Sequence, residues 1–71
     1  MVLDNHVSIL YDKMNAIGRE YDFQMDKRIY QDARNKIKHF IDNSGHLIKD
    51  TEYKLFEDYC RQVFEEYIPK L

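Results

Sequence analysis

The chain has 71 residues, a formal net charge of −2, 34% charged residues and a single cysteine. A chain of this length has room for one hydrophobic core, so we expect one domain over residues 1–71. A lone cysteine excludes an intramolecular disulfide, and the charge balance excludes a nucleic-acid-binding protein that is strongly basic throughout.

The first predicted helix spans residues 4–21. Its apolar residues recur in alternating steps of four and three, which is the spacing of one helix face. They are Leu3, Val7, Leu10, Met14, Ile17 and Tyr21. Gly18 lies beside this row, and because a glycine inside a helix costs about 0.5–1 kcal/mol relative to alanine, we expect a neighbouring helix to pack closely there.

The second predicted helix spans residues 27–43, and Asp26 is a suitable N-cap for it. Its inner face is expected to contain Ile29, Tyr30, Ala33, Ile37, Phe40 and Ile41. Gly45 is expected to end the helix in the left-handed conformation. The aliphatic residues Leu47 and Ile48 follow, and we expect them to cover one end of the core.

The third predicted helix spans residues 51–68. Its apolar row consists of Tyr53, Phe56, Cys60, Val63 and Tyr67. Asp50 or Thr51 is expected to cap the start of this helix, and Pro69 to end it.

Three amphipathic helices with short connections predict an all-α fold, a small antiparallel three-helix bundle with up-down-up topology. The same pattern is typical of helices that dimerise into a larger bundle, so the oligomeric state stays open at this stage.

Several apolar residues fall outside the inner rows of the first and third helices. They are Ile9, Tyr11, Ala16, Leu55, Tyr59 and Ile68. Surplus apolar surface of this kind is typical of an interface. The residues expected to dominate binding are Tyr11, Tyr53, Tyr59 and Phe64. The sequence therefore favours a small regulator, inhibitor or assembly subunit that binds a protein partner or another copy of itself.

The alternative hypothesis is a small nucleic-acid-binding regulator. One strip of the second helix carries residue types that contact phosphates and base edges, and we expect it to face solvent. It consists of Lys27, Gln31, Arg34, Asn35 and Lys38. A basic solvated strip beside an acidic third helix also simply gives complementary charges within the bundle or between two copies of it.

The sequence predicts no enzyme, metal site, cofactor or small-molecule substrate. No pair among His6, His39 and His46 has the spacing of a helical metal site. Cys60 falls on the inner face of a helix, where a small buried hydrophobe is expected.

No apolar run approaches the roughly 20 residues that a membrane span needs. The first ten residues lack the basic and apolar regions of an export signal, so we expect a cytoplasmic protein.

Overall fold

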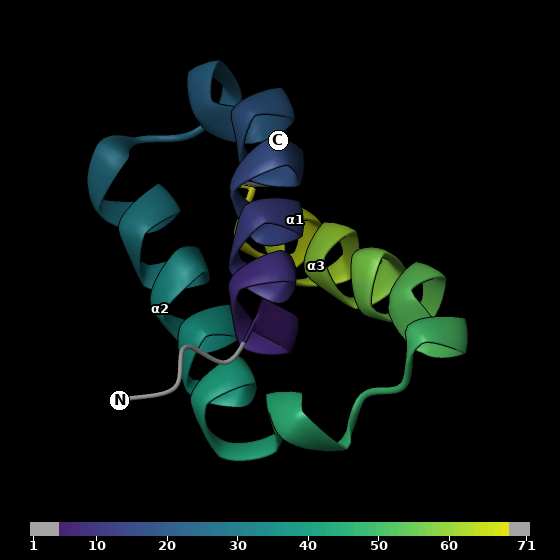
Figure 1. Cartoon of the computed structure of the whole chain (residues 1–71). Helices are drawn as coiled ribbons and strands as arrows, with labels where there is room; N and C mark the ends of the chain where they lie inside the picture. The colour runs from purple at the N-terminus through teal and green to yellow at the C-terminus, as the bar shows by residue number, and fades with distance from the viewer. Residues whose placement is uncertain (1–4, 69–71) are drawn as a thin grey trace.

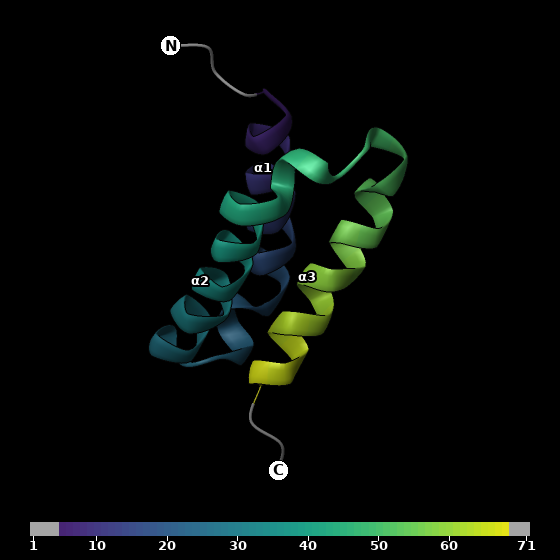
Figure 2. The same ribbon diagram turned by 90° about the horizontal axis from the view of Figure 1, so that it is seen from below.

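The computed structural model describes residues 5–68 and shows the predicted three-helix bundle. The helices are α1 (Asn5–Tyr21), α2 (Lys27–Ser44) and α3 (Tyr53–Tyr67). They run up, down and up, with α3 lying obliquely beside α1 and α2 (Figures 1 and 2). Within the described part of the chain there is no strand. The predicted roles of Leu3, Asp4 and Pro69 lie outside the described residues.

The connection between α1 and α2 contains the short 3₁₀ helix Asp22–Gln24. The predicted N-cap at Asp26 is confirmed, because its carboxylate accepts a hydrogen bond of 2.8 Å from the backbone N–H of Arg28. Met25, just before the cap, is buried. A polar cap next to a buried apolar residue fixes the point at which the chain reverses.

The connection between α2 and α3 differs from the prediction at Gly45. The φ of this residue is −58°, in the right-handed region, and the residue opens the 3₁₀ helix Gly45–Leu47. The prediction of a left-handed cap was therefore wrong. Glycine is needed here for space, because a Cβ would lie 3.0 Å from Leu10 Cδ1 and 3.2 Å from Ile41 Cγ2.

Two further details of this connection also differ. Ile48 packs against the core as predicted, whereas Leu47 is 68% exposed and does not cover it. The start of the 3₁₀ helix Asp50–Glu52 is held by Glu52, whose Oε1 accepts a hydrogen bond of 2.8 Å from the backbone N–H of Lys49. The predicted cap at Asp50 or Thr51 was therefore wrong, because α3 follows this 3₁₀ helix directly and no described side chain caps its start.

The core comes from the predicted apolar rows of all three helices. Its buried members are Leu10, Met14, Ile17, Tyr21, Met25, Ala33, Ile37, Ile41, Phe56, Cys60, Val63 and Phe64. Close packing at Gly18 is confirmed, because a Cβ there would lie 2.7 Å from the Tyr30 hydroxyl and 3.2 Å from Phe64 Cζ. The glycine lets the second and third helices approach α1 at this level.

Polar side chains join α1 to each of its neighbours. On the α3 side, Lys13 pairs with Glu57 at 2.9 Å and Arg61 pairs with Glu20 at 2.8 Å. Tyr21, at the end of α1, donates a hydrogen bond of 2.9 Å to Glu65. In the described part of the chain, the side-chain hydrogen bonds between helices all include a residue of α1.

Candidate functional site

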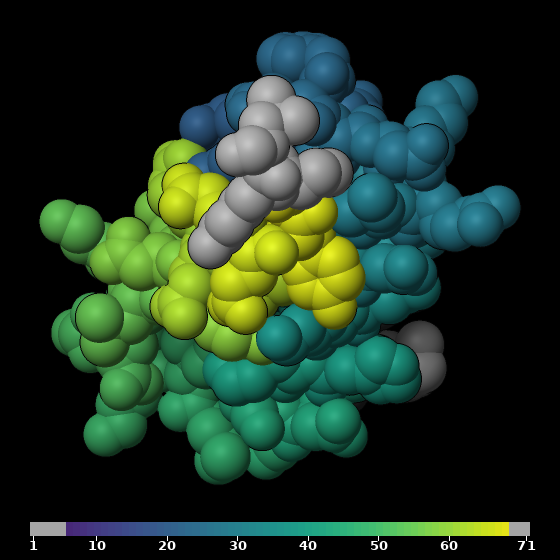
Figure 3. Space-filling view, turned by 180° about the vertical axis from the view of Figure 1, so that it is seen from behind, coloured from purple at the N-terminus to yellow at the C-terminus, as the bar shows by residue number. Residues whose placement is uncertain are grey.

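The seam between α2 and α3 is the apolar side of the bundle. Residues from the end of α2, the connection and the first half of α3 line a groove of about 310 Å³ along it. They are Phe40, Ser44, Leu47, Ile48, Glu52, Leu55, Phe56 and Tyr59. Figure 3 shows the face of the molecule on which α2 (teal) and α3 (green to yellow) adjoin.

Aromatic rings form the floor of this groove. The ring of Phe40 stacks on Phe56 with centroids 6.2 Å apart and meets Tyr59 with centroids 4.7 Å apart. Phe56 and Tyr59 are three residues apart, so they lie on neighbouring positions of one helix face. Aromatic contacts therefore join α2 to α3 along this seam, whereas hydrogen bonds and ion pairs join α1 to its neighbours.

Two leucines form the exposed rim of the groove. Leu47 is 68% exposed and Leu55 is 66% exposed. The described residues include four large apolar side chains that are exposed. The other two, Ile9 and Phe23, do not line the groove. A cluster of apolar residues around a hollow is typical of a surface that binds another molecule, whereas single exposed apolar residues are common.

The polar residues that line the groove are Ser44, Glu52 and Tyr59. The Glu52 carboxylate accepts a hydrogen bond from the backbone N–H of Lys49 at the start of the 3₁₀ helix Asp50–Glu52. Partial burial raises the pKa of the Tyr59 phenol, with smaller contributions from the charges near it. A neutral phenol and an apolar floor are suited to binding apolar side chains.

The structure separates the four residues that were predicted to dominate an interface. Tyr59 lies in the groove, whereas Phe64 is fully buried, with its ring 5.5 Å from that of Tyr21 and 5.6 Å from that of Tyr30. Phe64 is a core residue and presents no surface to a partner, which corrects its place in the predicted set. From the sequence, the position of Phe64 beside the apolar row of α3 is compatible with either a buried or an exposed side chain. The close approach of α1 and α2 buries it.

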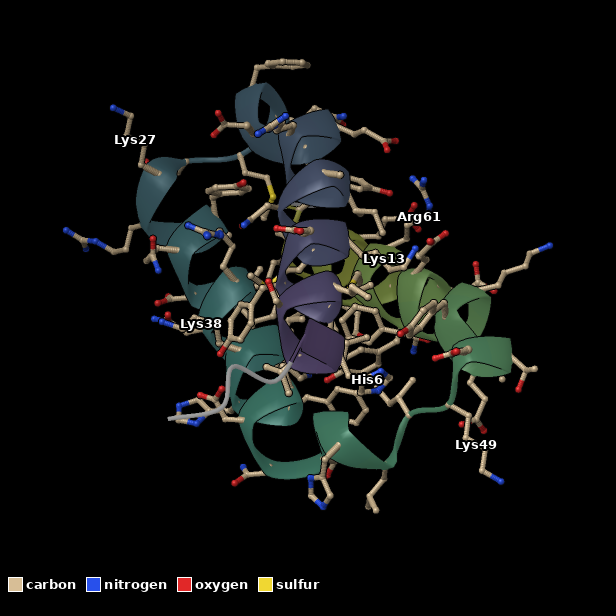
Figure 4. The ribbon with its side chains drawn as sticks, viewed as in Figure 1. His6, Lys13, Lys27, Lys38, Lys49 and Arg61 are labelled. Atoms are coloured by element: carbon tan, nitrogen blue, oxygen red, sulfur yellow. The ribbon has the colours of Figure 1, made fainter. Side chains whose placement is uncertain are left out.

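The other two predicted residues lie where α1 contacts its neighbours, Tyr11 on α1 itself and Tyr53 on α3. The Tyr11 hydroxyl donates a hydrogen bond to the Asp42 carboxylate, and this bond raises the pKa of the phenol. The Tyr53 hydroxyl lies 2.9 Å from His6 Nδ1, and Lys13 Nζ lies 5.1 Å from the centre of the Tyr53 ring. Figure 4 shows His6 and Lys13 on the side where α1 meets α3. An interface role for these two tyrosines stays a prediction.

The predicted basic strip of α2 is exposed in part. Lys27 and Lys38 project from the outer side of the helix (Figure 4). Arg34 is half-buried and turns toward α1, where its Nη2 donates a hydrogen bond of 2.8 Å to Asn15 Oδ1. The expectation that Arg34 faces solvent was therefore wrong. The remaining members, Gln31 and Asn35, are exposed and hydrogen-bond to each other.

The cysteine thiol and the histidines of the chain lie outside the groove. Cys60 is fully buried, and burial raises the pKa of its thiol to about 12, so the nucleophilic thiolate is suppressed. Among the residues that the structure describes, no cluster of three or more His, Cys, Asp or Glu side chains is arranged to hold a metal ion. A second hollow, on α3, is lined mainly by charged groups such as Asp58 and Glu66 of that single helix.

No protein-family model matches the chain, and the comparisons with curated proteins and with solved structures return no match. Between residues 5 and 68, none of the helices has the length and apolar character that crossing a membrane requires.

Sequence reasoning singled out only two of the eight residues that line the groove, and the most informative of those it missed are Phe40 and Leu47. Phe40 was placed on the inner face of its helix and Leu47 over the end of the core, although both line the groove. Leu55 and Tyr59 were recognised as surplus apolar residues. No signal in the sequence joins these four, because the path of the α2–α3 connection brings them together.

Proposed function

We propose that this chain is a small non-enzymatic protein-interaction module, a regulator, inhibitor or assembly subunit, that binds through the groove between α2 and α3. The observation that carries the proposal is the clustering of Leu47 and Leu55, each about two-thirds exposed, around an aromatic floor. Burying such side chains stabilises a complex by roughly 25 cal/mol for each Å² of apolar surface removed from water.

The shape of the groove favours a helical partner segment. It runs between two helices, and a third helix with apolar residues three and four positions apart fits a hollow of this kind. The partner is a second protein or another copy of the chain. Its apolar residues would cover the two leucines and contact the exposed edge of Tyr59.

Photo-crosslinking from position 55 tests this proposal. A photoreactive benzoylphenylalanine replaces Leu55 in one variant and Phe23 in a control variant. Phe23 is the better exposed residue, at 87%, but lies in the opposite connection, outside the groove. In cells that express the chain, we expect protein adducts from position 55 and few from position 23.

Two outcomes would contradict the proposal. Adducts of equal yield from both positions would indicate random collisions, and adducts from position 23 alone would place the interface elsewhere. Mass spectrometry of the adducts then identifies the crosslinked protein, including a second copy of the chain.

A further inference from the structure

The two helices that border the groove carry charges of opposite sign. Five Lys or Arg residues and two Asp residues occur in α2 (Lys27–Ser44). In contrast, α3 (Tyr53–Tyr67) contains four acidic residues and two basic ones. Several of these charges point toward α1, among them Arg34, Glu57 and Glu65, so the charges that matter for the groove are the exposed ones that continue its line.

One exposed charge on each helix continues the line of the groove beyond its end. Lys36 lies four residues before Phe40 and Glu66 lies seven residues after Tyr59, so each shares a helix face with a groove residue. Both charged residues are exposed. α2 and α3 run in opposite directions (Figure 2), and the rings of Phe40 and Tyr59 touch. Because Lys36 precedes Phe40 and Glu66 follows Tyr59, both charges lie toward the same end of the seam.

We infer that the occupant of the groove is a second copy of this chain, related by a two-fold axis parallel to the groove. In this arrangement α2 of each copy lies against α3 of the other. The inference rests on the proposed function, since it names the partner of the same groove. One surface supplies both the projecting leucines and the hollow that receives them, which a two-fold interface requires.

Charge selects this arrangement over the other way of stacking two grooves. A two-fold axis perpendicular to the helices would lay α2 on α2 and α3 on α3, and Lys36 of one copy would then lie away from Glu66 of the other. The parallel axis brings Lys36 of one copy toward Glu66 of the other, twice in the dimer. Complementary charges at the rim fix the register, while the leucines supply the buried apolar area.

Sedimentation velocity over a dilution series, with charge-reversal variants, tests the inference. We expect the wild-type chain to be a dimer at high concentration. Lys36→Glu and Glu66→Lys should each raise the dissociation constant about 10-fold. The double variant restores the opposite pairing, so its constant should return to within ~3-fold of wild type.

Two control variants complete the experiment. Lys38→Glu makes the same charge change on the opposite side of α2, and the dissociation constant should stay at the wild-type value. Leu55→Asp places a charge in the apolar rim, so the constant should rise at least ~30-fold. Circular dichroism of every variant confirms that the fold is retained.

A wild-type chain that stays monomeric at millimolar concentration would overturn the inference. So would a double variant without recovery, or a Lys38→Glu effect as large as that of Lys36→Glu. If the chain is monomeric but position 55 crosslinks to a different protein, the proposed function stands and only the self-partner is wrong. If position 55 gives no adducts and the chain is monomeric, both fail.

Discussion

The rings of Phe40 and Tyr59 meet across the seam of α2 and α3, with centroids 4.7 Å apart and planes tilted by 42°. Both rings are partly buried and pack against the core, and both line the groove. The floor of the groove therefore contributes to folding as well as to any binding. The rim residues Leu47 and Leu55 are the positions at which binding can be tested separately.

We predict that Tyr59→Ala lowers the free energy of unfolding by about 1–3 kcal/mol, less than the ~3–5 kcal/mol of a fully buried aromatic residue. Tyr59→Phe keeps the ring and should stay within about 0.5 kcal/mol of wild type. Urea denaturation measures both. An unchanged stability for the alanine variant would mean that the ring contact across the seam contributes nothing.

Gly18→Ala is expected to destabilise the bundle although alanine is the better helix former. The new Cβ would lie 2.7 Å from the Tyr30 hydroxyl and 3.2 Å from Phe64 Cζ. Overpacking costs about 1–3 kcal/mol, which outweighs the gain of about 0.5–1 kcal/mol in helix propensity.

Tyr30→Phe provides the matched test of this cause, because it removes the oxygen that the Cβ would meet. In thermal and urea denaturation, Gly18→Ala should cost less in the Tyr30→Phe background than in the wild type. Equal costs in the two backgrounds would show that the hydroxyl is not the obstacle.

Stability should fall at alkaline pH because of Cys60. Burial raises the pKa of this thiol from 9.0 to about 12, so the folded state holds the proton more tightly than the unfolded state. The contribution of the protonated thiol to the free energy of unfolding is complete below pH 9. It is lost as the pH rises toward 12, at up to about 1.4 kcal/mol for each pH unit.

Cys60→Ala removes this titration. Its urea midpoints at pH 8, 9 and 10 should decline less steeply than those of the wild-type chain, whatever the absolute stability of the variant. Slopes that match would assign the alkaline loss to other groups.

A salt titration with duplex DNA separates the proposed function from the nucleic-acid alternative. We expect no salt-sensitive binding of the chain to duplex DNA, even at low salt. Of the three cations in the basic strip, Arg34 is held by Asn15 of α1, and only Lys27 and Lys38 do not contact α1. A steep salt dependence that the double change Lys27→Glu and Lys38→Glu abolishes would favour the alternative instead.

Helical periodicity predicted most of this fold, because one face of each helix must be buried. Leu10, Ile37 and Phe56 are buried as their spacing required, and Gly18 lies at a close contact. The conformation of Gly45 was not predictable, because a glycine at a helix end is compatible with either handedness. The lack of space for a Cβ at this position was not predictable either, because it depends on Leu10 from another helix.

The candidate site was predictable only in part for the same reason. Leu55 and Tyr59 stand out as apolar residues beyond the buried row of their own helix. Their neighbours Phe40 and Leu47 come from sequence positions that read as core or as a lid. Their meeting depends on how the second connection places α3 against α2, which no local pattern encodes.

The most direct test of the groove as the binding surface is the accessibility of the Leu47 and Leu55 methyl groups to a soluble paramagnetic probe in NMR. As the chain associates or binds its partner, both methyl groups should become protected from the probe, while the ring of Phe23 stays accessible. Full accessibility of both leucines in the assembled state would contradict the account.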